Sequence, residues 1–171
     1  MSGIATNHIA VLDAVIARLL ATIDQLKPST CFLSLDTRPS IALQSNLFVT
    51  VAPMGGIFNV GVFDGGGRDG VLEETGVIVS AFSAMRLDRM EHAAKVLSDN
   101  SRGLLIMKHR VLDALAGHDL QDFFGNSLLT SLMQPVNSGH PQEALYGEHH
   151  VGFSLAFSTP FEWDLSAGAV P

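Results

Sequence analysis

The chain has 171 residues, a formal net charge of −7 and a single cysteine, Cys31. The acidic balance argues against a protein that grips the nucleic-acid backbone, which needs clustered lysine and arginine, and the lone cysteine excludes an intramolecular disulfide. The first residues lack the basic start of a signal peptide, and no run of 18 or more apolar residues predicts a membrane-spanning helix, so we expect a soluble protein without an export signal.

The first half of the chain predicts one helix followed by three strands. Apolar residues recur at helical spacing from Ile4 to Leu26, and Pro28 closes this helix. The stretch from Leu26 to Ser45 is expected to be irregular, with a short extended piece at Cys31, Phe32 and Leu33. Alternating residues then predict strands over Asn46 to Ala52, Phe58 to Phe63 and Val71 to Phe82, with a turn at Pro53 to Gly56 between the first two.

A glycine-rich stretch, FDGGGRDGV, joins the second of these strands to the third. A phosphate-binding glycine loop leads into the start of a helix, whose free amides bind the anion, whereas this stretch leads into a strand. It also lacks the Gly-Lys-Ser/Thr ending, and Asp64 and Asp69 would repel a phosphate. We therefore interpret it as a hairpin tip, and exposed tips often bind partners. The partner-contact candidates here are Asp64, Gly65, Gly66, Gly67, Arg68, Asp69 and Gly70.

The second half of the chain predicts two helices and one further strand. Helices are expected over Leu87 to Leu97 and Arg102 to Ala116, with Gly117 suited to the C-terminal cap of the second. The remaining segments are a short helix or strand in Phe123 to Met133, a polar loop from Pro135 to Gly147, a strand over Val151 to Ser158, and a mobile end at residues 166–171.

This order of elements predicts an α+β fold in which a mostly antiparallel sheet has its helices packed on one face. The three consecutive strands have short connections, so an antiparallel meander is the simplest pairing. The length favours a single domain over residues 1–165.

Nothing in the sequence predicts an active site, and we expect no catalytic residue, metal ion or cofactor. His149 and His150 are adjacent in an extended segment, so their side chains point to opposite faces and chelate one ion poorly. The same geometry separates the carboxylates of Glu73 and Glu74. Cys31 lies in an apolar run with no base nearby, which predicts a buried packing residue.

Trp163 lies beyond the last predicted strand, between acidic residues. Two interpretations of it are equally open. It covers the edge of the core, or it anchors a neighbouring subunit, since tryptophan is enriched at interfaces.

The overall pattern resembles the tail-terminator and related head–tail joining proteins of long-tailed bacteriophages. The resemblance covers roughly residues 4–165 and is one of element pattern, without a chemical signature. The matching features are the N-terminal helix with Leu12, Ile16 and Leu19, the strand from Glu74 to Val79 and the helix after it, the segments Gly103 to Leu105 and Val111 to Leu115, and the strand from Gly152 to Phe157 ending in Pro160 and Phe161.

This resemblance implies a structural, non-enzymatic protein of the virion tail or neck, assembled in the host cytoplasm. Such proteins form a ring, commonly of six subunits, that caps the tail tube and joins it to the head connector, while DNA passes through the lumen without specific binding. The low share of charged residues, 16%, suits extensive subunit contacts, and the acidity suits a channel that must not hold DNA. The implied partners are further copies of the chain, the tail tube protein and the connector protein, without a membrane.

The expected contact regions are the glycine-rich tip, Pro135 to Gly147 with His140, and Phe161 to Asp164 with Phe161 and Trp163. Alternatives stay open: a head-completion or tail-tube-like protein of the same assembly, an enzyme whose site assembles from distant residues, or a ligand-binding α+β module.

Overall fold

A computed structural model describes residues 8–34, 47–62, 69–84, 103–122, 124–129, 131–138, 142–144, 150–159 and 161–164. Within these ranges the chain forms two helices and seven strands. In chain order they are α1 (His8–Thr22), β1 (Cys31–Leu33), β2 (Leu47–Val62), β3 (Asp69–Ala84), α3 (Leu104–Leu115), β4 (Gln134–Ser138), β5 (Gln142–Ala144), β6 (His150–Ser158) and β7 (Phe161–Asp164).

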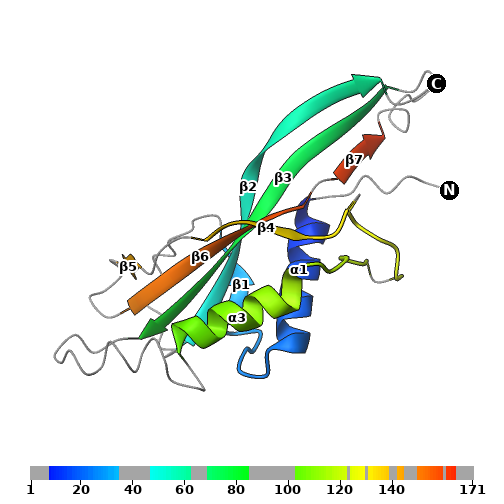
Figure 1. Ribbon diagram of the computed structural model, residues 1–171. Coiled ribbons are helices and arrows are strands. Elements are labelled where there is room, and N and C mark those ends of the chain that lie inside the picture. The colour runs from blue at the N-terminus through cyan, green and yellow to red at the C-terminus, as the bar shows by residue number, and fades with distance from the viewer. Residues whose placement is uncertain are drawn as a thin grey trace.

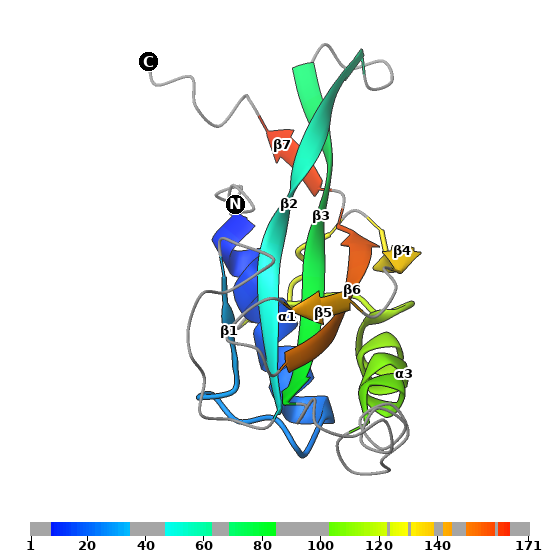
Figure 2. The same ribbon diagram turned by 90° about the vertical axis from the view of Figure 1, so that its left-hand side faces the viewer.

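The described strands form one mixed sheet in the order β1-β2-β3-β6-β4, with β5 added to β6 and β7 added to β3. The β1–β2 pair is parallel and every other pair is antiparallel. Figure 1 shows the long β2–β3 hairpin at the centre of this sheet, and Figure 2 shows the strong twist of its two strands. The predicted α+β class with a mostly antiparallel sheet is confirmed.

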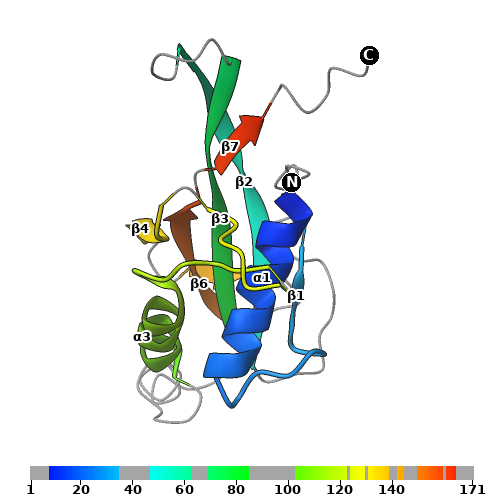
Figure 3. The same cartoon turned by 90° about the vertical axis from the view of Figure 1, so that its right-hand side faces the viewer.

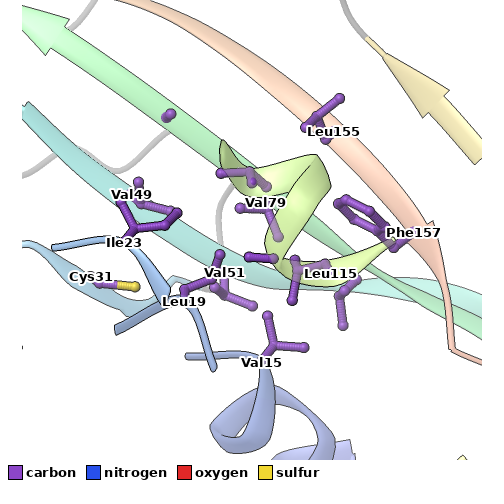
Figure 4. Close-up of a cluster of buried hydrophobic side chains, with 14 of the residues drawn as sticks. Val15, Leu19, Ile23, Cys31, Val49, Val51, Val79, Leu115, Leu155 and Phe157 are labelled. Carbon is purple, nitrogen blue, oxygen red and sulfur yellow. The ribbon is translucent and has the colours of Figure 1, made fainter. Parts of the chain in front are cut away.

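Both described helices cover the same face of the sheet, as Figure 3 shows. α1 packs on β1 and β2, and α3 packs on β3 and β6. The side chains between the helices and the sheet are fully buried and apolar (Figure 4). They include Val15 and Leu19 from α1, Ile23 just after it, Leu115 from α3, and Val49, Val51, Val79, Leu155 and Phe157 from the strands.

The opposite face of the sheet carries a second, smaller buried set of side chains. Phe48 and Phe82 stack with their ring centroids 4.8 Å apart, and Phe32 lies 6.3 Å from Phe48. The hydroxyls of Ser80 and Ser154 share a hydrogen bond of 2.8 Å on neighbouring strands. Residues 47–52 are therefore buried on both sides of β2.

α1 ends earlier than the sequence predicted. It stops at Thr22, whereas the predicted helix continued to Leu26. Ile23 and Leu26 remain buried, and the Leu26 amide donates to the Ile23 carbonyl in a turn. The apolar periodicity of the sequence continues past the end of α1 because Ile23 and Leu26, in the turn that follows, pack on the same core as the helix.

The predicted turn at Pro53 to Gly56 is wrong. β2 runs through it as one strand of 16 residues, and its register against β3 shifts between Met54 and Ile57. The extra residue is taken up by a β-bulge, which bends a strand without ending it. The central unit is therefore a long hairpin and not the expected three-stranded meander.

Two further expectations also fail. The described residues between 123 and 133 form neither a helix nor a named strand, and they carry only one isolated bridge, between Gln121 and Ser127. The region predicted as a polar loop from Pro135 to Gly147 contains β4 and β5, which are short edge strands. β4 is exposed at every residue, so no apolar alternation marked it in the sequence.

Other predictions hold within one or two residues. α3 and β6 match the expected second helix and last strand, and Gly117 has the positive φ of 72° that suits the residue after a helix. Cys31, Phe32 and Leu33 form β1, and Cys31 is buried as expected. The predicted helix from Leu87 to Leu97 and the end at residues 166–171 lie outside the described residues.

Candidate interaction surface

The half of the β2–β3 hairpin near its turn projects beyond both described helices (Figures 1 and 2). In this part, residues 57–62 of β2 pair with residues 69–74 of β3, and β7 pairs with β3 on its other side. We call these three paired segments the arm. No described helix packs on the arm, so its backbone edges and faces lie beyond the described body of the protein.

The arm meets the body at a bend centred on Thr75. The bulge of β2 sets Gly55 and Gly56 opposite this single residue of β3. The Thr75 hydroxyl donates a 2.9 Å hydrogen bond to the Met54 carbonyl oxygen, while the Thr75 carbonyl accepts a 3.0 Å bond from the amide of Thr159. Thr75 is buried, so these bonds pair its hydroxyl and its carbonyl, and they tie β3 to β2 and to the residue that follows β6.

Gly76, beside Thr75, has no room for a side chain. A Cβ atom there would overlap the backbone carbonyl oxygen of Phe157 on β6 and would lie 2.7 Å from the methyl carbon of Met54. Gly55, on the opposite side of the bend, would place a Cβ in open space. Only one of the two glycines is therefore required by close approach of neighbouring strands.

β7 continues the line of β6 along the same edge of β3. Ser158 lies opposite Gly76 and Phe161 lies opposite Glu73, so the register is unchanged across the residues between the two strands. Trp163 lies opposite Val71. The segment that was expected to follow the last strand is thus itself a strand, and it forms one outer edge of the arm.

The other outer edge of the arm belongs to β2. Near the body this edge bonds to β1: the Val49 amide donates to Thr30 and the Val51 carbonyl accepts from Ser34. β1 ends there, and no described strand pairs with β2 on this side beyond Val51. The edge from Ala52 to Val62 contains no ionisable residue.

The far edge of the sheet, at β4, differs from both. β4 contains Pro135, which has no amide hydrogen to donate, and its register shifts around Val136. Proline and bulges are the common means by which proteins make a sheet edge unsuitable for pairing. β4 is therefore a blunted edge. β2 also contains a proline, Pro53, and a bulge, but its register with β3 is unbroken from Ile57 to Val62, so this part of β2 leaves a regular edge, as β7 does.

A separate exposed feature is the loop around Asp122. Its carboxylate accepts hydrogen bonds of 2.8 Å from the amides of Phe124 and Asn126 and of 2.9 Å from the Asn126 side chain. These bonds, led by that of the Asn126 side chain, lower the pKa of Asp122. The loop holds Phe124 with 81% of its surface exposed, next to Gly125 with φ of 82°.

Two findings in the described residues concern metal binding and thiol reactivity. They hold no group of three histidine, cysteine or carboxylate side chains that could bind a metal ion. Burial raises the pKa of the Cys31 thiol to about 12, which disfavours the reactive thiolate. No described helix is long and apolar enough to cross a membrane.

The structure places four of the ten predicted contact residues. Asp69 and Gly70 lie in β3 rather than in a tip, opposite Val62 and Gly61, and Phe161 and Trp163 lie in β7. These four therefore share the arm. Asp64, Gly65, Gly66, Gly67, Arg68 and His140 lie outside the described residues, so their role stays a prediction. The outer edge of β2 was not among the predicted contact regions. The lack of any charged residue from Ala52 to Val62 would have indicated it, because charges commonly protect an exposed sheet edge.

Comparison with solved structures finds chains of similar fold at low sequence identity. No protein-family model matches the chain, and no curated protein matches it. Its fold is similar to that of a chain in the virion of a native gene transfer agent particle, with a TM-score of 0.53 and 15% identity over 90% of this chain and 95% of that one. A chain from the sheath/tube terminator of an extracellular contractile injection system in its extended state has a TM-score of 0.48 at 14% identity, over 91% of this chain and 56% of that one. The first comparison shows a shared fold over nearly the whole of both chains.

Proposed function

We propose that this chain is a non-enzymatic structural protein of a phage-like particle, and that it acts as a tail terminator. Copies of it form a ring at the head-proximal end of the tail tube, stop tube growth, and present a surface to the head connector. DNA passes through the lumen of the ring without specific binding. The observation that carries this proposal is the fold shared with a chain of a gene transfer agent virion over nearly the full length of both chains.

Features of the chain itself support the proposal. The described residues hold a packed core and an arm, but no metal-binding cluster and no reactive thiol. Charged residues make up 16% of the chain, which suits a protein that buries much of its surface against other subunits. The net charge of −7 suits a lumen along which DNA must slide.

The tail tube protein and the head connector are the partners that this role requires. The loop of residues 63–68 follows the end of the arm, so it is the segment we assign to contact with a neighbouring ring. Deletion of Gly65 to Gly67 is expected to leave the ring intact and to reduce the yield of joined particles. Normal numbers of joined particles from the deletion variant would remove this role from the loop.

The mass of the purified protein in solution, measured by light scattering at several concentrations, tests ring formation. Six copies of the 18.2 kDa chain have a mass of about 109 kDa. A closed ring gives a mass that stops increasing with concentration, whereas an open filament continues to grow. When particles assemble without this protein, their tails are expected to have uncontrolled lengths and to carry no attached heads.

A further inference from the structure

The two outer edges of the arm expose backbone groups that are set by the register. Backbone groups of successive strand residues alternate between the two neighbouring strands. The Thr75 carbonyl accepts its hydrogen bond from the side of β6 and β7. The backbone groups of Glu73 and Val71, two and four residues earlier, therefore also point toward β7. It follows that Glu162 and Asp164 of β7 direct their backbone groups away from β3, on the side where no described strand pairs with β7.

The same alternation identifies the open groups of β2. Ile57 and Asn59 lie opposite Glu74 and Leu72, whose backbone groups point toward β2. The backbone groups of Ile57 and Asn59 point toward β3 in return. Their neighbours Phe58, Val60 and Val62 therefore direct their backbone groups outward. A regular edge of this kind, without charge or proline, readily pairs with another strand.

We propose that β7 of one copy pairs with the outer edge of β2 of the next copy, so that the arms of neighbouring subunits form one continuous sheet. This inference rests on the proposed ring and names the surface that closes it. Each copy uses its β7 edge once and its β2 edge once, which is the head-to-tail contact that generates a ring.

Symmetry fixes the direction of this pairing. β2 and β7 both run opposite to β3, so they run in the same direction within one copy. Neighbouring copies in a ring of six are related by one sixth of a full turn, which is too small to reverse a strand, and β7 therefore meets the next β2 in parallel. The outer edge of β2 already accepts a parallel strand, β1, nearer the body.

Charge favours this pairing over the alternative in which identical edges meet. Two copies of β7 in contact would bring Glu162 and Asp164 of both copies together, and like charges across a strand pair are destabilising. Pairing β7 with β2 instead places these two carboxylates beside a strand segment that has no ionisable residue.

Disulfide cross-linking tests the proposal. Glu162→Cys is combined in turn with a cysteine at each position from 58 to 62, for example Val60→Cys, and the full-length proteins are oxidised and run on non-reducing gels. The native Cys31 can stay, because it is buried and its pKa of about 12 keeps it protonated at neutral pH. Glu162→Cys with Val136→Cys on the blunted β4 edge is the matched control, since Val136 is 61% exposed.

We expect at least one of the five double variants to give a ladder of cross-linked multimers up to the ring, while each single variant and the control remain monomeric on the gel. Cross-linked dimers from Glu162→Cys alone, or from a β2 cysteine alone, would overturn the proposal in favour of a two-fold contact. Light scattering on the same samples separates the two hypotheses. A ring without a ladder at any position overturns the strand pairing but keeps the proposed function, whereas a monomer at every concentration removes both.

Discussion

The hydroxyl of Thr75 donates a 2.9 Å hydrogen bond to the carbonyl oxygen of Met54, at the position where two glycines of β2 stand opposite one residue of β3. The bond joins β3 to β2 at the bulge, where the regular strand ladder is interrupted. It therefore lies at the junction between the body and the arm.

Thr75→Val keeps the shape of the side chain and removes the hydroxyl. We expect a loss of about 1–3 kcal/mol in the free energy of unfolding, because the Met54 carbonyl loses its partner at a buried site. Chemical unfolding followed by circular dichroism measures this. Thr50→Val is the matched control: Thr50 is buried on the same sheet, and its hydroxyl has no hydrogen-bond partner, so removal of that hydroxyl should not reduce stability. Equal losses at both positions would show that the Thr75 bond has no special role.

Gly76→Ala is expected to destabilise the protein by about 1–3 kcal/mol, because the new methyl group overlaps the backbone of β6, which cannot move as a side chain can. The midpoint of thermal unfolding measures the effect. Gly55→Ala at the same bend meets no atom within 4 Å and should leave the midpoint nearly unchanged. If both variants melt at the wild-type temperature, β3 and β6 are not as close as described.

Arg18→Met should weaken the contact between α1 and α3. The Arg18 guanidinium donates to the carbonyl oxygen of Ala114, near the C-terminal end of α3, where a positive charge is favourable. We expect a loss of about 1–2 kcal/mol in unfolding free energy, since bonds to charged donors contribute at the upper end of the usual range and this one is partly exposed to solvent. Lys27→Met removes the same charge from an exposed position and serves as the control in the same urea titration. A similar loss in both variants would point to net charge and not to this bond.

Order in the loop around Asp122 should depend on pH. Hydrogen bonds to its carboxylate lower the pKa of Asp122 in the folded protein, so the ionised form stabilises the loop. This contribution is complete above the unfolded pKa of about 3.9 and is lost as the pH falls through the lowered folded value.

Nuclear magnetic resonance titration should give that lowered pKa of Asp122, and amide exchange at Phe124 and Asn126 should accelerate in Asp122→Ala. Asp113→Ala, exposed on α3, should change neither rate. Unchanged exchange in Asp122→Ala would mean that the carboxylate does not order the loop.

The α+β class and most of the described elements could be predicted from the sequence because they follow apolar periodicity. α3 and β6 bury one face each, and β3 is rich in β-branched and other apolar residues from Val77 to Phe82, so these elements could be predicted. The turn at Pro53 to Gly56 could not be predicted correctly, because these residues are typical of turns when taken locally. They remain in a strand because β3 pairs across them on one side and because Pro53 lies on the open side, where its missing amide hydrogen is not needed.

The candidate interaction surface was harder to predict than the fold. β4 and β5 are short and polar, and they are strands only because β6 supplies their hydrogen-bond partners. The sequence pointed to Phe161 and Trp163 as contact residues, but it did not show that β7 pairs with β3 or that an edge of β2 stays open. The first fact depends on pairing between residues about 90 positions apart, and the second on the end of β1 opposite Val51; local pattern encodes neither.

Electron microscopy of tail tubes assembled in the presence of this protein shows whether it caps a tube. Tubes of the matching tail tube protein are expected to stop growing when the protein is added and to carry a ring of extra density at one end only. Tubes with bare ends and an unchanged length distribution, at protein concentrations well above that of the tube ends, would contradict the proposed function.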